Sequence, residues 1–177
     1  KYAFKQNHSM PCAYKRINHF NEKMAQFQGK EKTVIPDSVI NSVKNEVSKY
    51  KINKEDVTPS DIRKILKKLK YSKYYEHVNY ITSIIGNYEL PYLTSSQEET
   101  LRQMFHKIQS PFCKHSPASR KNFLNYAYIF RKFLELQSLD SMLDNFSELK
   151  SREKLYEQDR IWKLICNDLD WEYIPSI

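Results

Sequence analysis

Apolar side chains recur every three to four residues along most of this chain, a spacing typical of amphipathic helices. In residues 14–28 the apolar positions share one side of a helical projection, while basic side chains gather on the opposite side. Six further stripes of the same period follow between residues 36 and 169. Glycine occurs only twice in 177 residues. The pattern predicts an all-α fold, a single helical domain of about seven helices.

Local signals divide the chain into four segments. Residues 1–13 lack a helical period and are expected to form an extended leader. Residues 14–31 form a basic amphipathic helix that stops at Gly29, which suits the left-handed conformation at a helix C-terminus. We expect a helical core over residues 32–138, and a C-terminal helix with a folded-back, irregular tail over 139–177.

The core contains one strong helix start and one predicted loop. Residues 58–61, Thr-Pro-Ser-Asp, can form a capping box with proline in the first turn. A loop is expected from Pro111 to Pro117, and a central buried helix over 119–137. Five helices between residues 37 and 137 match the count and size of a cyclin-like fold, with some other helical packing as the alternative.

The balance of charge favours an anionic partner. The chain has 29 Lys and Arg against 21 Asp and Glu, a net charge of +8 and a pI near 9.2. Such a charge suits nucleic acid or an acidic protein surface. No apolar run approaches the ~20 residues of a membrane-spanning helix, and no signal peptide is visible.

Two stretches of the chain concentrate this positive charge. One is the polar side of residues 14–31, and the other is the outer side of the helix that starts at Thr58. An arginine can bind a phosphate through two parallel hydrogen bonds, although a run of lysines is often only a solvated helix face. The candidate contacts to nucleic acid or an acidic protein surface are Lys15, Arg16, His19, Lys23, Gln26, Lys30, Arg63, Lys64, Lys67, Lys68 and Lys70.

Motifs for catalysis are scarce. The chain has no phosphate-binding glycine loop, no H-E-x-x-H and no G-x-S-x-G. The adjacent Glu76 and His77 can be interpreted as an acid–base pair, or simply as a histidine near a carboxylate. Asp140, Asp144 and Glu148 have helical spacing and could bind catalytic metal ions in a nuclease, but we interpret them as an acidic solvent-facing side. We therefore expect no catalytic residues and no enzyme.

The cysteines argue against a metal site within this chain. Cys12, Cys113 and Cys166 are far apart and form no C-x-x-C pair. Cys113 and His115 supply two of the four ligands that structural zinc needs, and His8 with Cys12 could complete them only if the leader folded across. An odd cysteine number without a secretory signal indicates reduced thiols, in a cytosolic or nuclear compartment.

Several motifs occur in the order found in one viral family. The string Y-K-R-x-N-H-F-x-E, followed by Q-x-Q-G-K-E, spans residues 14–31, and T-P-x-x-I-R-x-x-L-K-K spans 58–68. Further matches are Tyr74–His77, Arg120–Tyr126 and Asp159–Trp162. Over about residues 14–171 the chain resembles the poxvirus late transcription factor 3 family of large cytoplasmic DNA viruses.

The resemblance implies a function in viral transcription. It implies a non-enzymatic factor that assists viral RNA polymerase at late promoters, with the polymerase, other viral late transcription factors and DNA as partners. The alternative is a protein–protein adaptor of the same machinery without direct DNA contact. The family carries a zinc-binding segment upstream of the Y-K-R helix, so zinc is implied there and no cofactor within this chain. The implied location is the viral factory in the host cytoplasm, with the nucleus or the virion as alternatives.

Overall fold

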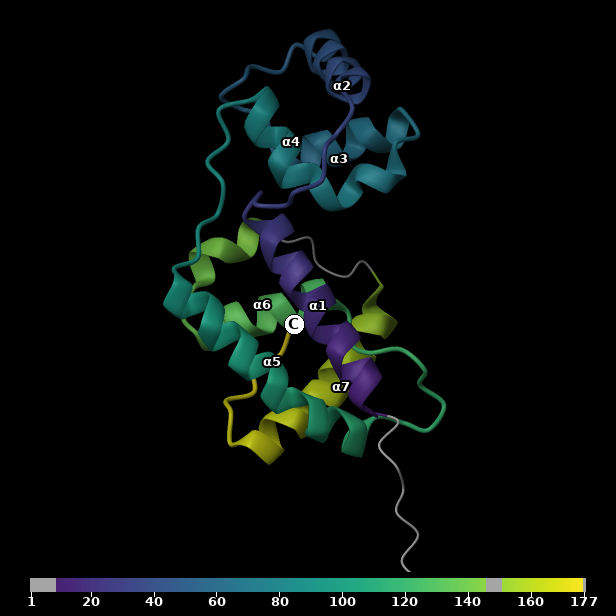
Figure 1. Cartoon of the computed structure of the whole chain (residues 1–177), viewed down its shortest axis with the longest axis vertical. Coiled ribbons are helices and arrows are strands. Elements are labelled where there is room, and N and C mark those ends of the chain that lie inside the picture. Colours follow the sequence, from purple (N-terminus) through teal and green to yellow (C-terminus); the bar gives the residue numbers. More distant parts are fainter. Residues whose placement is uncertain (1–8, 146–150, 177) are drawn as a thin grey trace, which may run out of the picture. The chain divides into compact units, whose positions relative to one another are not determined.

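The computed structural model describes residues 9–145 and 151–176, and within these ranges it is all-helical (Figure 1). The prediction of an all-α fold with about seven helices is confirmed. None of the described helices has the length and apolar character needed to cross a membrane. The elements are α1 (Ser9–Phe27), α2 (Asp37–Lys49), α3 (Pro59–Lys68), η1 (Ser72–His77), α4 (Val78–Ile85), α5 (Ser95–His115), α6 (Tyr126–Leu136), η2 (Asp140–Asn145) and α7 (Arg152–Leu169).

The helices group into two compact units. The α5–α7 unit comprises residues 1–21 and 95–177, and the α2–α4 unit comprises residues 22–94. Helix α1 supplies residues to both units, because the boundary lies after Asn21. The expected segment boundaries near residues 13, 31 and 138 do not coincide with these units. The helices expected for a cyclin-like core divide between them, and that arrangement stays a prediction.

The α2–α4 unit is built on the buried side of α3. Ile62, Ile65 and Leu66 pack into an apolar cluster with side chains from α2 and α4. The predicted capping box is confirmed, because the Thr58 hydroxyl accepts from the Asp61 amide at 3.2 Å and the Asp61 carboxylate accepts from the Thr58 amide at 3.1 Å. Pro59 occupies the first helical position, where its missing N–H costs nothing.

The C-terminus of α1 ends in the predicted left-handed glycine. Gly29 has φ +67°, and its amide donates to the carbonyl of Gln26 while Lys30 donates to that of Ala25, the two bonds of a Schellman motif. A Cβ at Gly29 would lie 2.8 Å from the end of the Leu90 side chain, so a larger residue would have to displace Leu90 as well as adopt a strained positive φ.

The core of the α5–α7 unit centres on Phe20 of α1. Its ring is fully buried and stacks between Phe105 of α5, at 4.3 Å between centroids, and Phe130 of α6, at 4.6 Å. Phe133 of α6 lies 6.0 Å from Trp162 of α7, so aromatic contacts continue to the last helix. Figure 1 shows α1, α5, α6 and α7 grouped in this unit.

Two expected helix boundaries in the α5–α7 unit are wrong. Helix α1 begins at Ser9, although residues 9–13 were expected to be extended; residues 1–8 lie outside the described part. Helix α5 continues through Pro111 to His115, where a loop was expected. Proline removes only one backbone hydrogen bond, and the burial of Phe112 holds the last turn against the core.

The predicted helix over 119–137 is shorter than expected. Helix α6 begins at Tyr126, because the Asn125 side chain caps it by accepting from the Tyr128 amide at 3.1 Å. Arg120 instead donates to the carbonyls of Asn122 and Phe123, which stabilises an irregular segment before the cap. The apolar residues of this segment reach the core without helical geometry.

The C-terminal tail folds back as predicted. Lys132 of α6 is 1% exposed, and its ammonium donates to the carbonyl of Ile174 at 2.7 Å. Asp159 of α7 accepts from the amide and hydroxyl of Ser176, at 3.0 and 2.6 Å, and from the Tyr128 hydroxyl. Burial acts to raise the pKa of Asp159, but these hydrogen bonds and the Lys132 charge outweigh it, so that pKa is lowered.

Replacing Phe20 by alanine should destabilise the α5–α7 unit strongly. The change leaves a cavity between two stacked rings, and such truncations cost about 3–5 kcal/mol. Both tryptophans of the chain, Trp162 and Trp171, lie in this unit, so urea unfolding followed by tryptophan fluorescence reports on it. Exposed Lys15 on the same helix gives the control, since Lys15→Ala should change stability by less than about 0.5 kcal/mol. A loss below about 1 kcal/mol for Phe20→Ala would contradict this packing.

Replacing Asp159 by asparagine should lower stability in a pH-dependent way. Hydrogen bonds to a charged group are worth about 1.5–3 kcal/mol, which corresponds to a fall in Tm of roughly 3–12 °C for a chain of this size. A lowered pKa stabilises the fold above the ordinary value of 3.8 and the effect disappears as pH falls through the folded pKa. The gap in Tm between wild type and variant should therefore be full at pH 7 and shrink below about pH 4.

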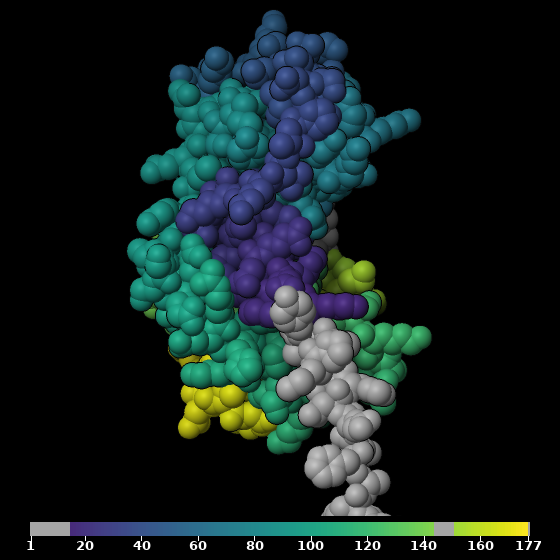
Figure 2. Space-filling view, in the orientation of Figure 1, coloured from purple at the N-terminus to yellow at the C-terminus, as the bar shows by residue number. Residues whose placement is uncertain are grey.

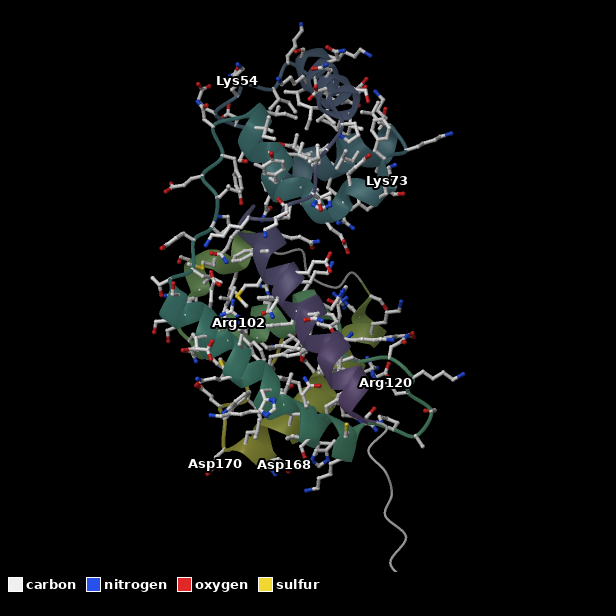
Figure 3. The ribbon with its side chains drawn as sticks, in the orientation of Figure 1. Lys54, Lys73, Arg102, Arg120, Asp168 and Asp170 are labelled. Carbon is white, nitrogen blue, oxygen red and sulfur yellow. The ribbon has the colours of Figure 1, made fainter. Side chains whose placement is uncertain are left out.

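Asp170 provides the matched control for this experiment. It ends α7 with φ +57° and is exposed (Figure 3), and asparagine tolerates that backbone conformation. Asp170→Asn should leave the Tm unchanged across the same pH range. An equal effect of the two variants would show that general surface charge, not the tail contact, controls stability.

Candidate nucleic-acid interface

The outer side of α3 presents an exposed basic face. Arg63, Lys64 and Lys67 follow one another at helical spacing, opposite the buried Ile62 and Leu66, and all three are exposed. Because the apolar side is fixed in the core, these three charges share one outward direction. We call Arg63, Lys64 and Lys67 the α3 basic face.

Positive charge continues beyond the end of α3. Lys70 adopts φ +59° as the helix ends, and Lys73 follows in η1 (Figure 3). Residues 62–75 contain six lysines and arginines and no acidic residue. Figure 2 shows long side chains projecting from the surface of the α2–α4 unit. The predicted contact residues do not include Lys73. The lack of any acidic residue between positions 62 and 75 would have indicated it.

Arg63 is oriented without being neutralised. Its guanidinium lies over the ring of Tyr75, 4.6 Å from the centroid. Among the described residues, no carboxylate comes within 4.0 Å of it. The contact with the ring restricts the side chain while its hydrogen-bond donors stay exposed. Sequence reasoning did not identify Tyr75, because the pairing depends on how η1 folds back beside α3.

Lys68 differs from its neighbours because its charge is compensated. Its ammonium donates to the Glu46 carboxylate at 2.9 Å and to the Tyr50 hydroxyl at 3.0 Å. Those two hydrogen bonds raise the pKa of Lys68, and bonds from Lys68 and Lys49 lower the pKa of Glu46. Lys68 is therefore ion-paired, and it lies next to the α3 basic face without being part of it.

The predicted residues of early α1 lie in the α5–α7 unit. Lys15 is exposed, and exposed His19 has its ring 4.5 Å from that of Tyr126. Arg16 is half-buried, donates to the Gln109 side chain at 3.2 Å, and lies over the ring of Phe123 at 4.7 Å. Its guanidinium thus packs within this unit, in contrast to that of Arg63.

The predicted residues of late α1 belong to the α2–α4 unit and mostly have partners there. Lys23 pairs with the carboxylate of Glu76, and buried Gln26 approaches the same carboxylate at 3.5 Å. Lys30 is exposed and lies over the ring of Tyr92. The structure therefore brings together Arg63, Lys64, Lys67 and Lys70 as exposed charges, and does not add Lys23 or Gln26 to that surface.

The carboxylate beside His77 is Glu31 rather than the adjacent Glu76. His77 is buried, and its Nδ1 lies 3.5 Å from an Oε atom of Glu31. Burial raises the pKa of Glu31 although His77 acts to lower it. Both carboxylate oxygens of Glu31 lack a hydrogen-bond partner in the part of the chain that the structure describes. No local signal predicts this pairing, since the two residues are 46 positions apart in the sequence.

The residues considered for metal binding do not form a site among the described residues. His115 contacts Asp168 at 2.7 Å, and Lys114 contacts the same carboxylate at 3.4 Å (Figure 3). The hydrogen bond from His115 is the main reason why the pKa of Asp168 is lowered. No group of three or more histidine, cysteine or acidic side chains comes together in the described ranges. His8 and Glu148 lie outside them, and the structure does not describe the side chains of Cys12 and Asp144.

Comparison with known proteins identifies the family. The family model described as "Poxvirus Late Transcription Factor VLTF3 like" matches residues 7–173. The protein named "Putative transcription factor A494R" of Paramecium bursaria Chlorella virus 1 is 46% identical over 166 residues, covering 93% of this chain and 46% of that protein. "Putative transcription factor R429" of Acanthamoeba polyphaga mimivirus is 44% identical over 165 residues, covering 93% of this chain and 38% of that protein.

The chain spans less than half the length of these two relatives. No solved structure matches it. The family match covers nearly the whole chain, and both relatives carry names that indicate viral transcription factors. The chain therefore belongs to the family of proteins similar to the poxvirus late transcription factor VLTF3.

Proposed function

We propose that this chain is a module of a viral late transcription factor, and that its α3 basic face binds duplex DNA through the phosphate backbone. The observation that carries the proposal is the exposure of Arg63, Lys64 and Lys67 without an acidic partner among the described residues. A polyanion gains most from charges that are not already compensated, because their binding releases counterions from the duplex.

The geometry of α3 suits contacts that position a duplex. A helix of this kind fits the major groove of DNA, and the α3 basic face spans only about one turn, which suits a few neighbouring phosphates. Arg63 can bind a phosphate with two hydrogen bonds, and Lys64 and Lys67 add point charges. Such contacts hold orientation and register without reading bases, so the proposed binding has little sequence preference.

Family membership supports the rest of the proposal. In this proposal the module acts without catalysis and assists viral RNA polymerase, together with other late transcription factors, at late promoters. Zinc, if the whole factor holds it, belongs to a part of the protein other than this chain. The proposed location is a viral factory in the host cytoplasm.

A protein–protein adaptor is a second candidate, and one observation favours it. Val34 is 87% exposed, and with exposed Ile84 it lines an open pocket of the α2–α4 unit beside Lys32 and Lys44. Apolar side chains exposed beside charges are common where another protein docks. In that case the contact surface would be this pocket, and the α3 basic face would meet acidic side chains of the polymerase.

Charge reversal of the α3 basic face should weaken duplex binding for every sequence alike. The variant Arg63→Glu/Lys64→Glu/Lys67→Glu removes three proposed phosphate contacts. Its affinity should fall roughly tenfold or more, and the slope of log K against log salt should become shallower by about three. Fluorescence anisotropy with two unrelated labelled duplexes over a range of salt concentrations measures both quantities.

A matched control separates a local effect from net charge. Lys107, Lys121 and Lys154 are exposed residues of the α5–α7 unit, and reversing all three to glutamate gives the same change in charge. This control should keep most duplex affinity. Equal losses of duplex affinity in the two variants would show that only the overall charge matters. In that case α3 would not be part of the interface.

Glu46→Gln should strengthen duplex binding. The substitution removes the carboxylate that compensates Lys68, so Lys68 becomes available to a phosphate beside the α3 basic face. We expect affinity to rise several-fold and the salt slope to steepen by about one. Asp37→Asn, an exposed carboxylate on the same helix α2, is the control. Unchanged binding of Glu46→Gln would place Lys68 outside the contact surface.

A further inference from the structure

A second basic face lies on α7, in the α5–α7 unit. Arg152, Tyr156, Arg160 and Lys163 are spaced four, four and three residues apart, and all four are exposed. The opposite side of the helix is buried through Leu155, Ile161, Trp162, Ile165 and Cys166. The helix therefore turns three positive charges and one aromatic ring in a common outward direction.

Tyr156 stands out because its ring contributes nothing to the core. The residue is 74% exposed, whereas Tyr128 and Trp162 in the same unit are buried. Burying an aromatic ring is among the larger apolar gains available to a fold, so a ring left outside is available for contact with a ligand. Its neighbours one turn away on either side are Arg152 and Arg160.

The arginines of this face are not neutralised within the described part of the chain. No described carboxylate lies within 4.0 Å of Arg152 or Arg160. Two acidic residues flank the face, Glu153 and Glu157, and Glu157 accepts a hydrogen bond from Arg120 at 3.0 Å. Glu157, three residues before Arg160, therefore already has a partner from outside α7. Asp159, adjacent to Arg160 in sequence, accepts from the hydroxyls of Tyr128 and Ser176.

We propose that this α7 face binds single-stranded nucleic acid. Tyr156 stacks on an unpaired base, and Arg152 and Arg160 bind phosphates on either side of it. Eight residues of helix separate the two arginines by about 12 Å along the axis, which leaves the ring between them open to a base. Aromatic rings combined with positive charge are the usual way in which proteins hold single strands without sequence preference.

A single strand fits this face better than a duplex does. The flat face of a base is free only when the base is unpaired, and in a duplex it is covered by its stacked neighbours. The α3 basic face shows the opposite pattern, because its Tyr75 ring is covered by Arg63. The site on α7 lies in the α5–α7 unit. The proposal for it does not depend on the proposed duplex binding by α3.

The test uses a labelled oligothymidylate of about 15 nucleotides, a length within the range that such sites cover, and the full chain. Tyr156→Ala should weaken binding by roughly 5- to 100-fold, the effect of losing one stacked base. Tyr156→Phe should bind like wild type, because it keeps the ring. Tyr156→Leu should be as weak as the alanine variant, and equal binding by leucine and tyrosine would overturn stacking.

Charge variants test the phosphate contacts separately. Arg152→Gln/Arg160→Gln should make the slope of log K against log salt shallower by about 1.4, at about 0.7 for each phosphate contact on a single strand. Tyr92→Ala removes a ring that is 65% exposed in the α2–α4 unit, and it should leave oligothymidylate binding unchanged. Circular dichroism of each variant checks that the helices persist.

The outcomes distinguish this inference from the proposed function. Binding of oligothymidylate that survives the triple reversal of the α3 basic face but falls in Tyr156→Ala supports the α7 site, whatever happens to duplex binding. Loss of oligothymidylate binding in the α3 variant, together with wild-type binding by Tyr156→Ala, would overturn it. No measurable affinity of the wild-type chain for oligothymidylate would overturn it as well.

Discussion

The burial of one side of α3 is the constraint on which the proposed interface depends. Ile62, Ile65 and Leu66 lie in the core of the α2–α4 unit, and a helix held on that side has no freedom to rotate its polar residues inward. The capping box at Thr58 fixes where the helix starts, and so fixes which residues of the following turns point outward. The direction of the positive charges is thus a consequence of apolar packing.

The positive charges of the chain fall into two classes: those with a partner inside their own unit and those without one. Lys23 and Lys68 are paired with carboxylates, and Arg16 is packed on aromatic rings. These side chains stabilise their own unit. Arg63, Lys64 and Lys67 have no such partner among the described residues, so their electrostatic field extends into solvent. A net charge of +8 is therefore a poor measure of binding capacity until each charge has been assigned to one class.

Much of the fold could be predicted because its signals are local. The Thr58 start, the Gly29 stop and the buried side of α3 each depend on a few neighbouring residues, and all three were correct. The errors occurred where contacts between residues far apart in the sequence determine the local structure. Pro111 lies inside a helix because Phe112 reaches the core, and Arg16 contacts Gln109, which lies 93 positions further along the chain. For the site, periodicity predicted the outward charges of α3, but the partners of Lys68 and Arg63 depend on tertiary packing.

Lys132 has a practical consequence for following the state of the α5–α7 unit. Its ammonium is enclosed by the Ile174 carbonyl and the carboxylates of Glu135 and Asp159. An amine-modifying reagent will therefore label the exposed Lys64 and Lys67 readily, while it spares Lys132 for as long as the tail stays in place. Peptide mass spectrometry then measures the rate at which Lys132 is labelled, and this rate reports how often the tail opens. No added fluorophore or engineered residue is needed.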